Sequence, residues 1–187
     1  MAQKLEFEVV LYPDPVLRKV SEPVRAFDED LQAVVAAMFS RMRKSKGVGL
    51  AAPQIGLRQR VLVVGPSGEE KDDLVLINPI LVARAGERVV FDEGCLSFPG
   101  IYAEVTRPDR CTVQSLDLTG RPVEKEYSGF TSRIIQHEYD HLEGILLVDR
   151  MTPAEKLKHK SALDELVTRY KRARPPEGPR REAARQG

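Results

Sequence analysis

The stretch SGFTSRIIQHEYDHLEG, residues 128–144, carries two of the chain's three histidines, His137 and His141, with Glu138 between them. Its residues recur at helical spacing, so we predict a helix that ends at Gly144. Residues i and i+4 of a helix lie one above the other, so both imidazoles can reach one metal ion. Glu138 points about 100° around the helix, where it can reach a water held by that ion. This H-E-x-x-H pattern therefore predicts a metal-binding helix at the centre of the fold.

The same letters also occur on solvated helix faces that bind no metal, so the third ligand becomes the deciding question. In proteases that continue the pattern as H-E-x-x-H-x-x-G-x-x-H, the third ligand falls on Leu147, which cannot bind a metal. That class is excluded. Another protease layout takes a glutamate from a second helix. Glu165 is available for such an endopeptidase, but it belongs to a charged segment and is more simply a surface residue.

The two cysteines are the remaining candidates for the third ligand. Cys95 lies in EGCLSFPG, residues 93–100, between a glycine and a bend rich in serine and proline. Cys111 opens an alternating run, where a lone cysteine is typically a small buried hydrophobe. A His2Cys set leaves a fourth position for water, as in catalytic sites. The settings of the two cysteines favour Cys95 as the third ligand, although spacing alone does not establish it. With a fourth protein ligand, from Cys111 or Asp140, the chain would instead be a peptide-binding module with a structural metal.

The rest of the chain indicates an α+β fold. Strand-like runs rich in valine and isoleucine come first and helices follow, without strict βαβ alternation. We expect mainly antiparallel sheets around the metal-binding helix, together with an N-terminal helix and a C-terminal helix. The expected elements are a helix over 28–46, a loop over 47–56, strands at 60–64, 73–83, 87–91, 103–107, 111–118 and 123–127, and a last helix that starts at Thr152.

Length and composition bound the organisation of the chain. Its 187 residues suit one domain, expected over residues 1–173, and residues 174–187 carry three prolines and read as a disordered basic tail. A net charge of +1 provides no global field that would favour nucleic acid. No apolar run is long enough to cross a membrane. The few cysteines and the lack of a targeting signature predict a cytoplasmic protein.

Three segments together resemble one family. GVGLAAPQIG at 47–56, EGCLSFPG at 93–100 and QHEYDHLEG at 136–144 are similar, in order, to the three signature motifs of peptide deformylases. The resemblance covers about residues 5–170. It implies an enzyme that removes the formyl group from the N-terminal N-formylmethionine of nascent polypeptides and releases formate. It also implies one divalent metal ion per chain, bound by the cysteine of the second motif and the histidines of the third, and Fe(II) in most members. Zn, Ni or Co can substitute.

The resemblance also assigns catalytic roles. Glu138 is expected to move the proton from water to the leaving amine. The side-chain amide of Gln54 and the backbone N–H of Leu96 are expected to stabilise the negative charge that develops on the formyl oxygen. Glu93 and Arg107 are expected in a supporting polar network. As a metal ligand, Cys95 is strengthened by this match beyond what the residues alone indicate.

Substrate contacts and partners follow in the same way. The resemblance implies that the backbone around Val48 and Gly49 pairs with an extended peptide, that Gly94 contacts the substrate, and that Ile134 lines a pocket for the methionine side chain with Val48. The expected partner is the N-formylmethionyl nascent peptide. Basic residues near the C-terminus suggest a contact with the ribosome beside the exit tunnel, and no membrane contact is expected.

Overall fold

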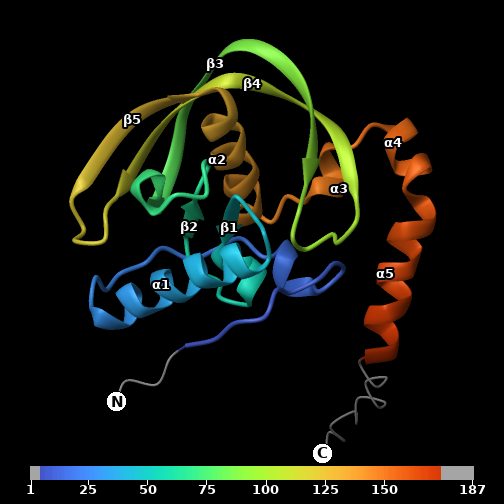
Figure 1. The fold of residues 1–187 in the computed structure, drawn as a ribbon, viewed down its shortest axis with the longest axis horizontal. Coiled ribbons are helices and arrows are strands. Elements are labelled where there is room, and N and C mark those ends of the chain that lie inside the picture. The colour runs from blue at the N-terminus through green and yellow to red at the C-terminus, as the bar shows by residue number, and fades with distance from the viewer. Residues whose placement is uncertain (1–4, 174–187) are drawn as a thin grey trace, which may run out of the picture.

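An antiparallel sheet that arches over one helix forms the frame of residues 5–173, the part of the chain that this computed structural model describes (Figure 1). The sheet has five strands in the order β1-β2-β3-β4-β5, and every neighbouring pair is antiparallel. The predicted α+β class is confirmed. The strands are β1 (Gly49–Ala51), β2 (Val61–Val64), β3 (Leu74–Gly94), β4 (Tyr102–Leu116) and β5 (Pro122–Ser128).

Helices cover both faces of the sheet at β2. The side chains of Val61 and Val63 pack with α1 (Glu29–Lys44), whereas Leu62 and Val64 pack with α2 (Gly129–Leu142). Since successive strand residues point to opposite faces, a fully apolar strand is the expected result of burial on both sides. All four residues are fully buried. This packing holds α2 inside the arch, where Figure 1 places it beneath β3 and β4.

The predicted N-terminal helix is confirmed as α1. The side chain of Asp28 accepts a hydrogen bond from the backbone N–H of Leu31, which satisfies one of the unpaired donors at the helix start. Arginine and lysine residues occupy the last turn, where they complement the helix dipole. The buried face of α1 contains Leu31, Val35, Met38 and Met42.

The long strands β3 and β4 each replace two predicted strands. β3 runs on through the expected break, and its register shifts between Ala85 and Arg88 where Gly86 has a φ of +80°. β4 continues through Pro108, which lies beyond the last pair of β4 with β5, Arg110 and Ser128. A proline there costs no ladder hydrogen bond, because no strand within residues 5–173 pairs with β4 on that side. Gly86 therefore marks a bulge in β3, and Pro108 marks an unpaired edge of β4. Neither residue marks the end of a strand.

The central helix ends where the sequence predicts. Gly144 follows α2 with a φ of +71°, a left-handed conformation that glycine adopts without strain. A Cβ at this position would also lie only 2.5 Å from the backbone oxygen of Arg18. Both the conformation and the close approach of the N-terminal segment require glycine here.

The C-terminal helix is divided in two. Thr152 caps α4 (Pro153–Lys158) as predicted, its hydroxyl accepting a hydrogen bond from the N–H of Glu155. His159 interrupts the helix before α5 (Lys160–Ala173). A short helix, α3 (Leu147–Arg150), precedes both and was not predicted. The described chain also contains three 3-10 helices, Pro15–Arg18, Ala52–Ile55 and Glu70–Asp72.

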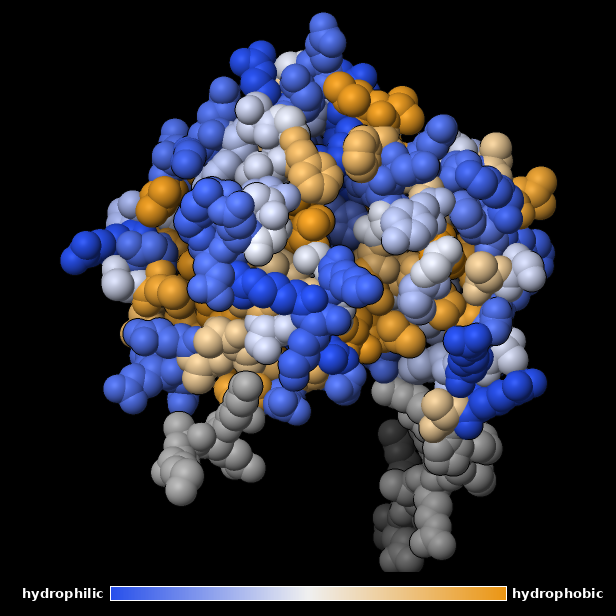
Figure 2. Space-filling view, viewed as in Figure 1, coloured by the Kyte–Doolittle hydropathy of each residue, from blue (hydrophilic) through white to orange (hydrophobic). Residues whose placement is uncertain are grey.

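Surface composition agrees with a folded domain of mixed polarity. Figure 2 shows the apolar residues of one face in several separate groups, divided by hydrophilic ones. No helix within residues 5–173 is long and apolar enough to span a bilayer. The tail predicted over residues 174–187 lies outside the described residues.

Candidate active site

Three buried side chains converge where β3 ends against α2. Cys95 follows the last residue of β3, and His137 and His141 lie one turn apart on α2. Ligand atoms of the three residues all lie within 4.8 Å of one another, and within residues 5–173 they form the only such group of three. The Sγ atom of Cys95 lies 3.2 Å from Nε2 of His141. The structure thus brings together the three residues that the sequence favours as metal ligands.

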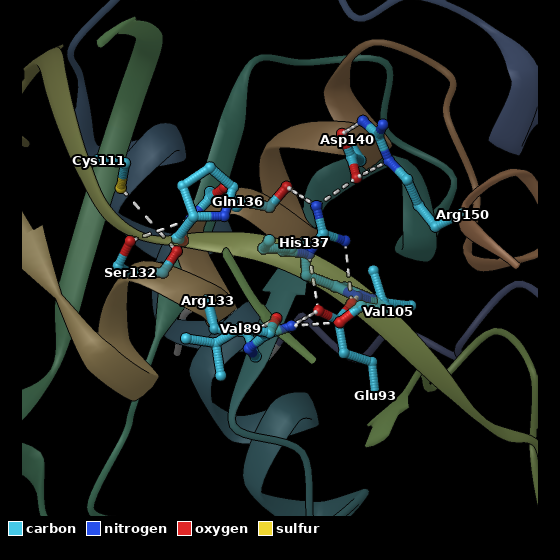
Figure 3. Close-up of polar contacts among 12 residues, drawn as sticks. Val89, Glu93, Val105, Cys111, Ser132, Arg133, Gln136, His137, Asp140 and Arg150 are labelled. Atoms are coloured by element: carbon cyan, nitrogen blue, oxygen red, sulfur yellow. Dashed lines mark hydrogen bonds and ion pairs between the residues drawn. The ribbon is translucent and has the colours of Figure 1, made fainter. Parts of the chain in front are cut away.

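A carboxylate fixes the orientation of the His137 ring. Oε2 of Glu93 lies 2.9 Å from Nδ1 of His137, so the opposite ring nitrogen is left to face the cysteine and the second histidine. The Glu93 carboxylate, labelled near His137 in Figure 3, accepts two hydrogen bonds from the Arg107 guanidinium, 2.7 and 3.0 Å long. Burial alone would raise the pKa of Glu93, but hydrogen bonds from His137 and Arg107 lower it from 4.5 to about 2. Glu93 is therefore ionised at neutral pH.

The chemistry of the donor set fits a divalent cation. Burial, with the charges of His137 and Arg107, lowers the pKa of His141 well below its usual value, so His141 is neutral. Burial would also lower the pKa of His137, but hydrogen bonds to Cys95 and Glu93 raise it well above 6.5. In the chain by itself, His137 is therefore protonated. A thiolate and two imidazoles are ligands for which Zn and Fe compete with protons.

Glu138 lies beside this group and remains free to accept a proton. Burial raises its pKa from 4.5 to about 7. Its Oε2 atom is buried and has no hydrogen-bond partner among residues 5–173. A carboxylate with a pKa near the working pH is suited to general base and general acid steps in turn.

The loop after β1 orients Gln54. The N–H of Ala51 donates a 2.8 Å hydrogen bond to Oε1 of Gln54, so the amide nitrogen points the other way. That nitrogen lies 3.5 Å from Sγ of Cys95 and 3.3 Å from Oγ of Ser97. Leu96, next to Cys95, donates no backbone hydrogen bond within residues 5–173. Two donors are therefore available near the cysteine.

The N-terminal segment ties these two loops together, which the sequence did not indicate. The N–H of Val10 donates to the backbone oxygen of Gln54 at 2.7 Å, and the N–H of Tyr12 donates to that of Ser97 at 3.0 Å. The ring of Tyr12 also stacks on Phe98, with 4.8 Å between the centroids. One short segment thus sets the separation of the donors.

A cavity of about 560 Å³ opens beside Cys95 and His137. The predicted substrate contacts Val48, Gly49, Gly94 and Ile134 all line it, as do Leu96 and Glu138. Reasoning from sequence missed the aromatic residues of its wall. Phe91 and Phe130 lie with ring centroids 6.0 Å apart, and both are partly exposed. The helical spacing of Phe130 from Ile134 and His137 was the available signal.

The alternative ligands lie elsewhere. Glu165 is on the exposed face of α5 and pairs with Arg169 at 2.5 Å. The Sγ atom of Cys111 is 3.9 Å from the backbone oxygen of Ser132 and packs in the core. Arg107 and Arg150 hold the carboxylate of Asp140. Within residues 5–173, the structure therefore gives no geometric support to an endopeptidase site that uses Glu165. It gives none to a structural metal site with a fourth ligand from Cys111 or Asp140.

Known proteins are similar to this chain in sequence. The polypeptide deformylase family model matches residues 7–157. Peptide deformylase 1B of Arabidopsis thaliana, chloroplastic/mitochondrial, is 44% identical over 191 residues, covering 99% of this chain and 70% of that protein. The Thermotoga maritima peptide deformylase is 39% identical, with 89% of this chain and 99% of that protein covered.

Solved structures agree with this comparison. A crystal structure of Arabidopsis thaliana peptide deformylase 1B with an inhibitor matches at a TM-score of 0.85 and 44% identity, covering 91% of this chain and 97% of that one. The Plasmodium falciparum peptide deformylase matches at a TM-score of 0.87 and 41% identity, covering 90% and 99%. From the family model and these relatives, the chain belongs to the polypeptide deformylase family.

Proposed function

We propose that Cys95, His137 and His141 hold one divalent metal ion with which this peptide deformylase removes the formyl group of N-formylmethionine from nascent polypeptides. The observation that carries the proposal is the convergence of three buried ligand atoms within 4.8 Å. When bound, the ion supplies a Lewis acid that polarises the formyl carbonyl and makes water a nucleophile at neutral pH.

Glu138 is proposed as the group that moves the proton. Its carboxylate accepts a proton from the attacking water, and the water oxygen forms a bond to the formyl carbon. The carboxylic acid then returns the proton to the nitrogen as the C–N bond breaks. The formic acid so formed passes its proton to the α-amine, so the products are formate and a protonated α-amine, and atoms and charges balance. The pKa of about 7 for Glu138 suits both directions of transfer.

Gln54 and Leu96 are proposed to stabilise the oxygen on which negative charge develops. The amide NH2 of Gln54 is directed toward Cys95, and the N–H of Leu96 is available in the same loop. Donors fixed before the reaction need no reorganisation as charge develops, and each contributes roughly 3–4 kcal/mol in comparable sites.

The peptide is proposed to bind as an added strand. β1 lies at the end of the sheet order, so one of its edges pairs with no strand of the described sheet. Val48 and Gly49 on this side and Gly94 across the cavity offer backbone groups to an extended chain. The methionine side chain fits the apolar wall formed by Val48 and Ile134.

The metal proposed for the working enzyme is Fe(II). Thiolate and imidazole ligands suit Fe and Zn alike, so Zn, Ni or Co can take the same position. Fe(II) beside a thiolate oxidises readily, and we expect an iron-loaded sample to lose activity in air while a nickel-loaded sample keeps it. Equal air stability of the two samples would contradict iron as the labile metal.

We further propose a cytoplasmic location and contact with the ribosome. Free thiols at Cys95 and Cys111 suit a reducing compartment. Lys171 and Arg172 at the end of α5 make no ion pair within residues 5–173 and are available to RNA phosphates. Co-sedimentation with ribosomes that is unchanged by Lys171→Glu with Arg172→Glu would contradict this contact.

Formate release tests the central proposal. Anaerobically prepared protein of known metal content is given N-formyl-Met-Ala-Ser, beside the variants Cys95→Ala and Cys111→Ala. We expect the parent and Cys111→Ala to contain one metal per chain and to release formate, and Cys95→Ala to lose both. Metal-loaded parent that releases no formate would overturn the proposed reaction, and metal retained by Cys95→Ala would overturn the ligand set.

A further inference from the structure

A continuous series of charged side chains runs from the protein surface to the ring of His137. It consists of Arg150, Asp140, Arg107 and Glu93, and Figure 3 labels Arg150, Asp140 and Glu93 together with His137. The inner three are buried, whereas the side chain of Arg150 is 38% exposed. We infer that Arg150, on α3, is a positioning residue for the proposed metal centre and slows release of the bound ion.

The contacts at the inner end are tight and directional. Arg107 uses Nε and Nη2 for the two oxygens of Glu93, and Glu93 contacts Nδ1 of His137. Arg133 also donates to Glu93 at 2.7 Å. A carboxylate on the outer nitrogen of a ligating histidine fixes the ring and increases its basicity toward the metal. The orientation of Arg107 therefore bears on His137 through one intervening carboxylate.

Asp140 links Arg107 to the surface. Nη1 of Arg107 donates to Oδ2 of Asp140 at 2.8 Å. Arg150 donates two hydrogen bonds to the same carboxylate, from Nε to Oδ2 at 2.9 Å and from Nη2 to Oδ1 at 2.5 Å. Asp140 and Arg107 are each about 5% exposed or less, so neither can replace a lost partner with bulk water easily.

Loss of Arg150 removes the hydrogen-bond partner of one Asp140 oxygen. Oδ1 of Asp140 contacts Arg150 alone within residues 5–173. The carboxylate is then free to rotate, and Arg107 loses a rigid acceptor. Replacement of groups one shell beyond a metal ligand typically lowers metal affinity 10- to 100-fold. Because Arg150 acts on His137 only through Asp140, Arg107 and Glu93, we expect the lower limit of this range, about a tenfold loss of metal affinity.

The experiment compares metal release with stability. Zinc-loaded full-length parent, Arg150→Ala and Arg18→Ala are mixed with a chromogenic chelator, and the rate of zinc loss is measured. Arg18 is the matched control, because it pairs with Asp149 on the same helix and its side chain is 43% exposed. The thermal unfolding of each metal-free protein is measured in parallel.

We expect Arg150→Ala to lose zinc about tenfold faster than the parent and Arg18→Ala to lose it at the parent's rate. Arg150→Lys keeps one donor group in place of the two that contact Asp140, so its rate of zinc loss should lie between those of Arg150→Ala and the parent. It serves as the test variant if the alanine variant does not fold. A parent rate in Arg150→Ala, or equal acceleration in Arg18→Ala, would overturn the inference. It rests on the proposed metal centre, whose separate failure would appear as a parent that binds no zinc.

Discussion

The backbone N–H of Ala51 donates a 2.8 Å hydrogen bond to Oε1 of Gln54. This contact decides which end of the amide faces the cysteine, because an amide that accepts at its oxygen must turn its NH2 group away. The 3-10 helix Ala52–Ile55 brings the two residues together three positions apart. A donor is thus fixed toward the site by local backbone geometry before any substrate binds.

Replacement of Gln54 by alanine should slow turnover without loss of metal. Removal of one fixed oxyanion donor lowers kcat roughly 100- to 1,000-fold in comparable enzymes. We expect formate release by Gln54→Ala to fall in that range, with metal content unchanged, because Gln54 is not a ligand in the proposed set. Gln59→Ala, an exposed glutamine beyond the same loop, is the control and should match the parent. An unaffected kcat in Gln54→Ala would contradict the oxyanion role.

Replacement of Glu138 by glutamine should separate metal binding from proton transfer. The amide keeps the shape of the side chain but cannot accept the water proton, so kcat should fall by roughly 10²–10⁴. Metal content should remain at one ion per chain. Glu165→Gln, on exposed α5, should retain full activity, and a large loss there would instead revive the endopeptidase arrangement. A Glu138→Gln variant without metal would contradict a purely catalytic role.

The sequence predicted the features that depend on local periodicity. Helical spacing placed His137 and His141 on one face of α2, and Thr152 and Gly144 marked a helix start and a helix end. These follow from residues at most four positions apart, whose geometry a helix fixes. Cys95 was favoured by its bend and by the resemblance, and the structure brings it to His141 from 46 residues away in the chain.

The features that were missed depend on contacts between distant segments. Pro108 suggested a strand end, yet β4 continues because its edge at that point faces no other strand. The contact of Arg150 with Asp140 joins a short helix to α2, and the clamp from Val10 and Tyr12 joins the N-terminal segment to two loops. Neither leaves a periodic pattern, so only the packed chain reveals them.

A methyl group at Gly49 should disturb the site by sterics alone. A Cβ there would lie 2.5 Å from Oε1 of Glu138 and 2.6 Å from Cγ2 of Ile134. Glu138 must then shift, and a displacement of about 1 Å can cost roughly 100-fold in rate. We expect kcat/KM of Gly49→Ala to fall by about that factor. In the control Gly47→Ala, the nearest atom to the Cβ is Cδ1 of the Leu96 side chain, at 2.8 Å, which can rotate away, and the nearest backbone atom is the oxygen of Gly49, at an ordinary 3.4 Å. Equal losses in both variants would contradict the steric argument.

The buried carboxylate of Glu93 should make the stability of the metal-free protein depend on pH in acid. Its pKa is about 2 in the folded chain and ordinarily 4.5, so its ionised form stabilises the fold fully above pH 4.5. That contribution, roughly 3 kcal/mol, is lost as the pH falls from 4.5 toward 2. In Glu93→Gln the charge is absent at every pH, and Arg107 and Arg133 lose their shared anion. We therefore expect the variant to be less stable than the parent at neutral pH, and the difference to shrink below pH 4.5.

Urea unfolding of both metal-free proteins, from about pH 6 down to about pH 3, measures this difference in the free energy of unfolding. Glu87→Gln removes an exposed carboxylate from the same strand and controls for the change in net charge. A gap between the parent and Glu93→Gln that stayed constant over this range would mean that Glu93 does not titrate as its ion pairs require. A gap that widened in acid would reverse the sign of the linkage and contradict a lowered pKa. A gap that narrows only for Glu93→Gln would tie the stability of the fold to the carboxylate that orients His137.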